Sequence, residues 1–82
     1  MTEELGAELR NVLELLIDSP DELEIDEIPT GRSGTCFELR LAPEDAGKVI
    51  GRQGRTIRAL RTLLEVRGAK DGRRYELEIL DD

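Results

Sequence analysis

Two glycines separated by two residues stand in the most basic stretch of this sequence. Gly51 and Gly54 enclose Arg52 and Gln53. Glycine adopts backbone angles that other residues resist, and it lets another molecule approach the backbone closely. A helix that begins directly after Gly54 would present free N–H groups and the positive end of its dipole, which together bind anions. The pattern therefore indicates a phosphate-binding loop, although a tight turn between two helices would need the same two glycines.

Acidic and basic residues are unevenly distributed along the chain. The 82 residues include 12 Lys and Arg against 19 Asp and Glu, a net charge of -7. Residues 47–74 hold nine of the basic residues and two of the acidic ones, so this segment carries +7 and the remainder −14. Such asymmetry indicates an anion-binding face on an acidic body, with a solvated helix face as the alternative. The basic candidates around the two glycines are Lys48, Arg52, Arg55 and Arg58.

Composition excludes several classes of function. The length predicts a single domain over residues 1–82. No apolar run reaches the roughly 18 residues of a membrane span, and the acidic N-terminus lacks the features of a secretory signal. The absence of histidine and the single cysteine, Cys36, exclude His-dependent catalysis and a Cys/His zinc site, and they fit a reducing compartment. We therefore expect a binding module without catalysis, metal or cofactor.

The elements that would position the glycine loop follow from hydrophobic periodicity. Helices are expected over residues 3–17 and 43–50 and from about 54 onward, the last of them capped by Gly68. Strands are expected over residues 22–28, 35–41 and 73–80. Residues 29–34 are rich in turn formers and would join the first two strands into a hairpin. The buried stripe of the last helix is expected to comprise Ile57, Leu60, Leu63 and Leu64.

The order of these elements, α-β-β-α-α-β, favours the α+β class. The strands are too short and too few for paired crossovers on both faces of a sheet. A three-stranded sheet with helices packed on one face is the economical architecture. The side chains expected to face the helices are Leu23, Ile25, Phe37, Leu39, Leu41, Tyr75, Leu77 and Ile79.

The residues around the loop carry a resemblance to a known family. Ile50, Gly51, Gly54, Ile57 and Leu60 together spell I-G-x-x-G-x-x-I-x-x-L. This is the signature of a KH domain, whose GXXG loop clamps about four nucleotides of single-stranded nucleic acid. With its element order and length, the whole chain resembles a type II KH domain, and in particular the small single-domain bacterial KH proteins of the KhpA type.

The resemblance implies RNA binding, with roles for particular residues. The sugar-phosphate chain would be held by Gly51, Arg52, Gln53 and Gly54, with Lys48, Arg55 and Arg58 beside them. Family members often carry lysine where this chain has Arg52, and arginine binds phosphate as well. Bases would lie in an apolar groove, for which the candidates are Val49, Ile50 and Ile57, with the core as the alternative place for Ile50 and Ile57. Arg40 is a further candidate, its alternative being a solvated charge among acids.

The resemblance also implies a cellular setting. Proteins of this type are cytoplasmic, act as RNA chaperones or post-transcriptional regulators linked to cell shape and division, and pair with a second KH protein of the KhpB/Jag type. A homodimer or a heterodimer is therefore expected. The alternative is a protein-interaction module that has kept the KH fold and binds RNA secondarily. The charge of −14 outside the basic segment favours that alternative, because it repels RNA everywhere except at the loop.

Overall fold

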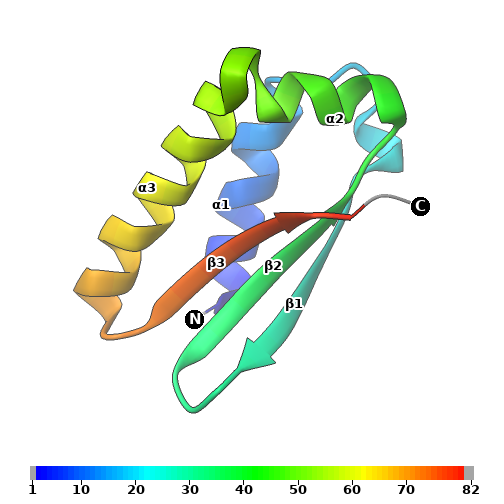
Figure 1. The fold of residues 1–82 in the computed structure, drawn as a ribbon. Coiled ribbons are helices and arrows are strands. Elements are labelled where there is room, and N and C mark those ends of the chain that lie inside the picture. The colour runs from blue at the N-terminus through cyan, green and yellow to red at the C-terminus, as the bar shows by residue number, and fades with distance from the viewer. Residues whose placement is uncertain (1, 81–82) are drawn as a thin grey trace.

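The computed structural model describes residues 2–80, and it has the predicted α-β-β-α-α-β order with two added 3₁₀ turns (Figure 1). The helices are α1 (Thr2–Glu14), α2 (Pro43–Ile50) and α3 (Arg55–Asp71), the 3₁₀ turns are η1 (Pro20–Glu22) and η2 (Arg52–Gly54), and the strands are β1 (Glu24–Thr30), β2 (Gly34–Arg40) and β3 (Arg74–Ile79). No helix in this part of the chain has the length and hydropathy needed to cross a membrane.

The three strands form one mixed sheet in the order β1-β2-β3. β1 and β2 pair antiparallel as the predicted hairpin, with Thr30 opposite Gly34 across a three-residue turn. β3 returns after the two helices and pairs parallel to β2. The connection of α2 and α3 between these parallel strands sets the glycine loop at the far end of the helical layer from the hairpin turn (Figure 1).

The helices cover one face of the sheet and leave the other open (Figure 1). Phe37 and Leu39 of the central strand are fully buried against Leu13 of α1 and Val49 of α2. Most of the predicted inward residues join this core, and Ile25, Leu41 and Ile79 are partly buried at its margin. Strand alternation therefore identified the buried face of the sheet correctly.

The predicted helix over residues 3–17 is too long, because α1 ends at Glu14. The reason lies in the next helix. The buried carboxylate of Asp45 accepts hydrogen bonds from the backbone N–H groups of Asp18 (3.1 Å) and Ser19 (2.9 Å). Those amides are bonded to a side chain of α2, so the chain must leave the axis of α1 before it reaches them.

The first strand is shifted by two residues from its predicted position. It begins at Glu24 and continues through Pro29 to Thr30, where the sequence indicated a turn. Proline lacks an N–H group, but β1 is an edge strand, and an edge strand tolerates a missing donor on its outer side.

Two predictions about the last helix are wrong. Gly68 does not end α3, which continues to Asp71 and is capped by Gly72 at φ 68°. Gly68 is instead buried inside the helix, where a Cβ would collide with the carbonyl oxygen of Arg73 as the chain turns back. Leu63 was expected in the buried stripe, but its side chain points to solvent.

Candidate nucleic-acid interface

The loop between α2 and α3 is a single tight turn with three positive φ angles. Gly51 has φ 77°, Gln53 φ 57° and Gly54 φ 72°. A side chain at Gly51 would collide with Thr56, whose backbone nitrogen would lie 2.9 Å from the added Cβ. Gly54 donates its N–H to the carbonyl oxygen of Gly51 at 3.0 Å, which closes the turn. The glycines are thus required by the backbone, and the prediction of a turn between two helices is confirmed.

Gln53 has two arginine partners. The Arg58 guanidinium donates to the Gln53 carbonyl oxygen at 2.9 Å, and Arg55 donates to its side-chain oxygen at 3.1 Å. The left-handed backbone of a non-glycine residue is thereby held in place by the helix that follows it. The loop is fixed before any ligand arrives.

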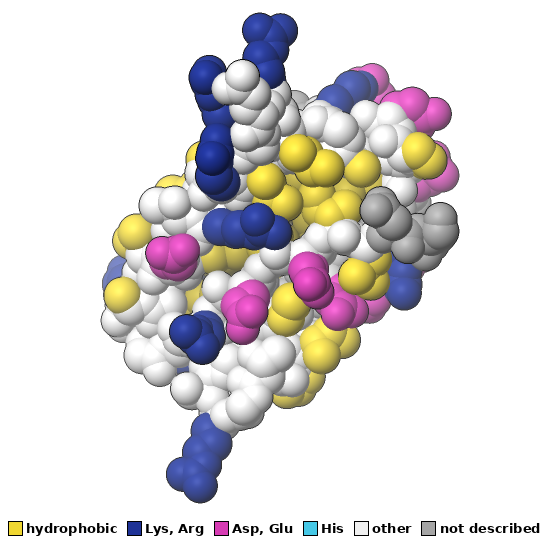
Figure 2. All heavy atoms as spheres, in the orientation of Figure 1, with side chains coloured by type: hydrophobic (Ala, Val, Ile, Leu, Met, Phe, Trp, Pro, Cys, Tyr) yellow, Lys and Arg dark blue, Asp and Glu magenta, His cyan; other side chains and the backbone are white. Residues whose placement is uncertain are grey.

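Arg52 differs from these two arginines. Its side chain is exposed, and it forms no hydrogen bond or ion pair with any other residue between positions 2 and 80. It lies beside the start of α3, whose first turn no side chain caps. A helix N-terminus without a side-chain cap, next to a guanidinium that has no partner among the described residues, is suited to binding a phosphate. Figure 2 shows the basic side chains that project over this end of the molecule.

Lys48 already has acidic partners outside the loop. Its ammonium group pairs with Asp18 and lies 3.6 Å from Asp45. The hydrogen bond with Asp18 is the main reason that the pKa of Lys48 is raised. The Asp18 N–H is the main reason that the pKa of Asp45 is lowered, although burial opposes this shift. Lys48 therefore ties α2 to the α1–η1 connection, with its charge largely matched.

The three apolar groove candidates occupy different positions. Val49 is completely buried in the core, and Ile57 is buried as well. Ile50 is 40% exposed at the end of α2, directly before the loop. Of the three, only Ile50 offers apolar surface to a ligand. Figure 2 shows a hollow of apolar side chains below the loop, between the helices and β3.

Arg40 lies at the end of β2, half-buried, with its guanidinium 3.4 Å from the Asp26 carboxylate on the neighbouring strand. This position fits the predicted alternative of a charge set among acids.

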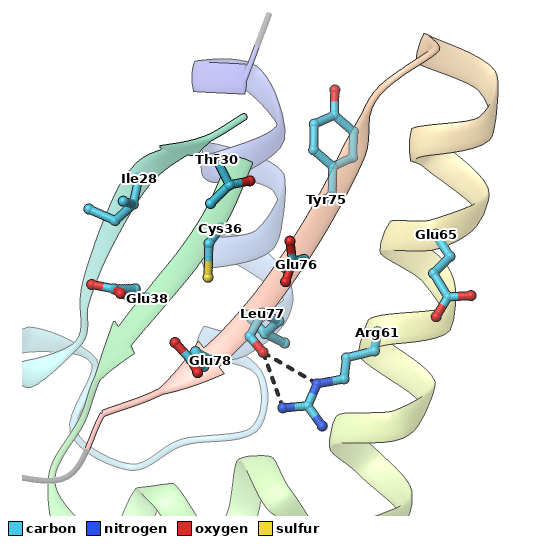
Figure 3. A pocket seen from close by; sticks show the side chains of 10 residues that line it. All are labelled: Ile28, Thr30, Cys36, Glu38, Arg61, Glu65, Tyr75, Glu76, Leu77 and Glu78. Atoms are coloured by element: carbon cyan, nitrogen blue, oxygen red, sulfur yellow. Dashed lines mark hydrogen bonds between the residues drawn. The ribbon is translucent and has the colours of Figure 1, made fainter. Parts of the chain in front are cut away.

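Arg61 is a residue that the motif analysis missed. From α3 it donates two hydrogen bonds to the Leu77 carbonyl oxygen, from Nε at 3.3 Å and from Nη2 at 3.1 Å (Figure 3). β3 is an edge strand. On the side of β2, Arg74 donates its N–H to the Ser33 carbonyl just before β2, and Leu80, just after β3, donates to Leu39. The Leu77 carbonyl therefore points away from β2, and Arg61 bridges α3 to the free edge of the sheet. The only sequence signal was its place on the helical wheel, at the boundary of the buried stripe.

One group of side chains on the open sheet face has the proximity of metal ligands. The Cys36 sulfur and carboxylate oxygens of Glu38 and Glu78 lie within 4.8 Å of one another (Figure 3). Burial, followed by the nearby carboxylates, raises the pKa of the Cys36 thiol, which disfavours the thiolate that binds metals. Cys36 is buried, as expected for a small packed residue, and we assign no metal to the group.

The fold and the loop together define a class of protein. A mixed three-stranded sheet with helices on one face, and a GXXG turn between its second and third helices, is a type II KH domain. The family model described as "KhpA/KhpB, KH domain" matches residues 7–79, and the chain belongs to this family.

Bacterial relatives match over most of their lengths. "RNA-binding protein KhpA" of Borreliella burgdorferi is 47% identical over 70 residues, which cover 85% of this chain and 84% of the relative. The protein of the same name from Aquifex aeolicus is 46% identical, covering 89% and 96%. That from Clostridium acetobutylicum is 42% identical, covering 88% and 95%. No solved structure gives a significant match.

Proposed function

We propose that this chain binds single-stranded RNA through the Gly51–Gly54 loop. The observation that carries the proposal is the Arg52 guanidinium, which has no hydrogen-bond or ion-pair partner among the described residues. It lies in a preformed turn beside the first turn of α3, which no side chain caps. A cation, an accessible backbone and a helix N-terminus are the usual components of a phosphate site. The printed names of the relatives, which describe RNA-binding proteins, support the nature of the ligand.

The residues of the site have different tasks in this proposal. Arg52 contacts phosphate directly, and the backbone from Gly51 to Gly54 follows the sugar-phosphate chain. Arg55 and Arg58 keep Gln53 in its left-handed conformation and add positive potential. Lys48 acts through α2, because its ammonium group is already paired.

Bases would lie below the loop. Ile50 provides the exposed apolar contact, and Arg61 with the free edge of β3 provides hydrogen-bonding groups. Val49 and Ile57 support this surface from the core. Arg40 is retained only as a more distant contact for a longer strand. So few groups give little sequence preference, as is usual where shape and backbone dominate the recognition of a short single strand.

In the cell we propose a non-catalytic role as an RNA chaperone or post-transcriptional regulator in the cytoplasm, linked to cell shape and division. The support is the resemblance to KhpA-type proteins. Pairing with another KH domain, from a KhpB/Jag-type protein or a second copy, belongs to the same proposal. The alternative function, protein interaction with RNA secondary, is favoured by the large apolar side chains that α3 exposes.

The test is a binding titration with a matched charge control. Changing Arg52→Asp and Gln53→Asp should weaken binding of a labelled eight-nucleotide RNA at least about tenfold, because a charge-assisted phosphate contact is lost and repulsion is added. Aspartate tolerates the left-handed backbone at position 53, so the loop should stay folded. Fluorescence anisotropy gives the Kd, and circular dichroism checks the fold.

The control pair is Arg32→Asp and Ser33→Asp in the β1–β2 turn. These exposed residues lie at the opposite end of the sheet from the loop, and the pair changes the net charge by the same amount (Figure 1). The control should bind RNA nearly as the parent does. Equal losses in both pairs would mean that net charge alone drives binding, and equal retention would remove the loop from the site.

A further inference from the structure

A hollow of about 480 Å³ extends over the free edge of β3 toward α3 (Figure 3). Its charged lining consists of Arg61 and Glu65 from α3 and of Glu38, Glu76 and Glu78 from the sheet. Four carboxylates and one guanidinium give this space a negative potential, which repels a phosphate. An uncharged ligand with hydrogen-bond donors and acceptors fits these surroundings better.

Arg61 presents a pair of free donors to this hollow. Its hydrogen bonds to the Leu77 carbonyl oxygen come from Nε at 3.3 Å and from Nη2 at 3.1 Å, which is one edge of the planar guanidinium (Figure 3). The other edge, formed by Nη1 and Nη2, keeps two N–H groups that point the same way. Between residues 2 and 80 no carboxylate forms an ion pair with Arg61. The bonds to the backbone therefore orient a free fork of donors.

Glu65 supplies the complementary acceptor. It lies four residues after Arg61, so the two side chains are neighbours on the surface of α3. Both line the hollow, but no hydrogen bond or ion pair joins them, and Glu65 is exposed with no partner in the described part of the chain. A donor fork and a carboxylate thus lie side by side, and both are available to a ligand.

Among the four RNA bases, guanine matches this pair of groups. Its O6 and N7 are adjacent acceptors, and arginine bound to both is the commonest specific contact with a base. Its N1–H and its amino group are adjacent donors, which a carboxylate accepts with two oxygens. Adenine has a donor beside N7, uracil has an N–H between its two acceptors, and cytosine has only one donor group on its pairing edge.

The hollow lies within reach of the loop. Arg58, Arg61 and Glu65 follow one another at intervals of three and four residues, so they line one side of α3. Arg58 already donates to the carbonyl oxygen of Gln53 in the loop. From the start of α3 at residue 55 to residue 61 the helix rises about 9 Å. A strand whose phosphates lie at the loop can therefore place a neighbouring base beside Arg61.

We propose that this hollow binds one guanine of the RNA, with O6 and N7 at Arg61 and with N1–H and the amino group at Glu65. The inference rests on the proposed RNA binding at the loop and adds a preference at a single position. The surrounding carboxylates keep the sugar-phosphate chain out of the hollow, so that the base enters and the backbone stays at the loop.

The test compares RNAs that differ in one base. Labelled eight-nucleotide adenine RNA carries A, G, C or U at one central position, and fluorescence anisotropy gives each Kd at constant salt. The parent should bind the G-containing RNA at least about fivefold more tightly than the other three, which is the lower end expected of a good bidentate contact. An RNA with 7-deazaguanine lacks the N7 acceptor and should lose most of this advantage.

Two variants assign the preference to its residues. Arg61→Lys keeps the charge but removes the fork, so it should bind the G-containing RNA no better than the adenine RNA. Glu65→Gln should reduce the ratio of the two Kd values, because an amide offers a single acceptor oxygen; its exposed, unpartnered site leaves the fold unaffected. The control is Arg67→Lys, whose side chain bonds to Glu8 of α1 instead, and it should keep the ratio.

The outcomes separate this inference from the loop proposal. Equal binding of all four RNAs by the parent, a preference for cytosine, or a guanine preference that survives in both Arg61→Lys and Glu65→Gln would overturn the guanine site. Each of these results would leave RNA binding at the loop standing. A parent that binds none of the RNAs would overturn both proposals.

Discussion

Gly47 and Gly68 both lie inside helices, yet a methyl group added to each would meet different surroundings. At Gly47 of α2 nothing lies within 4 Å of the added atom. At Gly68 of α3 the added atom would collide with the backbone oxygen of Arg73 and would contact the ring of Tyr75. Gly68 also accepts the N–H groups of Gly72 and Arg73, which turn the chain into β3. Only the second glycine is required by packing.

The two alanine variants should therefore change stability in opposite directions. Gly47→Ala should raise the free energy of unfolding by about 0.5–1 kcal/mol, because alanine restricts the unfolded chain and favours helix. Gly68→Ala should lower it by about 1–3 kcal/mol, because backbone atoms must shift to admit the methyl group. Urea denaturation measures both changes. A Gly68→Ala variant as stable as the parent would contradict this account.

Predictions about single residues from the sequence succeeded where the structure depends on neighbouring residues in the chain. The positive φ angles at Gly51 and Gly54 follow from residue type and spacing, which the motif contains. The hydrogen bonds of Arg61 to Leu77 and of Lys48 to Asp18 join residues far apart in the chain, so no local pattern indicates them. The motif therefore gave the loop itself but could not say which of its basic neighbours are already engaged.

At the scale of elements, α2 is held in place by one buried carboxylate. Asp45 accepts two backbone N–H groups from the α1–η1 connection and has the Lys48 ammonium 3.6 Å away. The folded environment lowers the pKa of Asp45, chiefly through the Asp18 N–H. A carboxyl whose pKa is lower in the folded state stabilises the fold above its unfolded value, about 3.9. That contribution is lost as the pH falls through the folded value.

Asp45→Asn should show this dependence directly. Near pH 7 the variant should melt at a lower temperature than the parent, because a neutral amide is a weaker acceptor for two N–H groups. As the pH falls below about 4 the difference should shrink, since the parent's own carboxyl becomes protonated. Thermal melts followed by circular dichroism at several pH values measure the gap. A gap that is constant with pH would exclude the proposed contribution of the ionised carboxylate.

Element types were predictable and element ends were less so. Alternation identified the inward residues of β2 and β3, and the helix-start composition at Pro43 with the glycine at position 51 located α2 with its correct bounds. The end of α1 depends on the Asp45 carboxylate, and the extension of β1 through Pro29 depends on its place at the sheet edge. Both are decided by tertiary contacts that periodicity does not contain.

For the whole molecule, the order of elements and the binary pattern were sufficient to predict the fold class. They could not predict that α3 is apolar on its outer side as well. Leu63 fits the buried stripe by spacing, but the stripe is already filled by Ile57, Leu60 and Leu64. Spacing along a helix therefore identifies a candidate face, and the packing of the whole molecule decides which members of that face are buried.

The charge distribution of the whole molecule predicts a weak salt dependence of RNA binding. Only the 47–74 segment is basic, so about three or four phosphates should be neutralised, which corresponds to a slope of about −2 to −3 in log K against log salt concentration. Anisotropy titrations of a short RNA over a range of KCl concentrations give the slope. A much steeper slope would mean that a broad surface, not one loop, contacts the strand.

The two edges of the sheet have a consequence for behaviour in concentrated solution. β1, one edge strand, contains Pro29 and the acidic residues Glu24, Asp26 and Glu27, and Arg61 covers the Leu77 carbonyl on the edge of β3. Proline, charge and covered backbone are features by which sheets avoid adding strands from other chains. The protein should therefore resist fibrillar aggregation through its sheet, even where crowding brings many copies together.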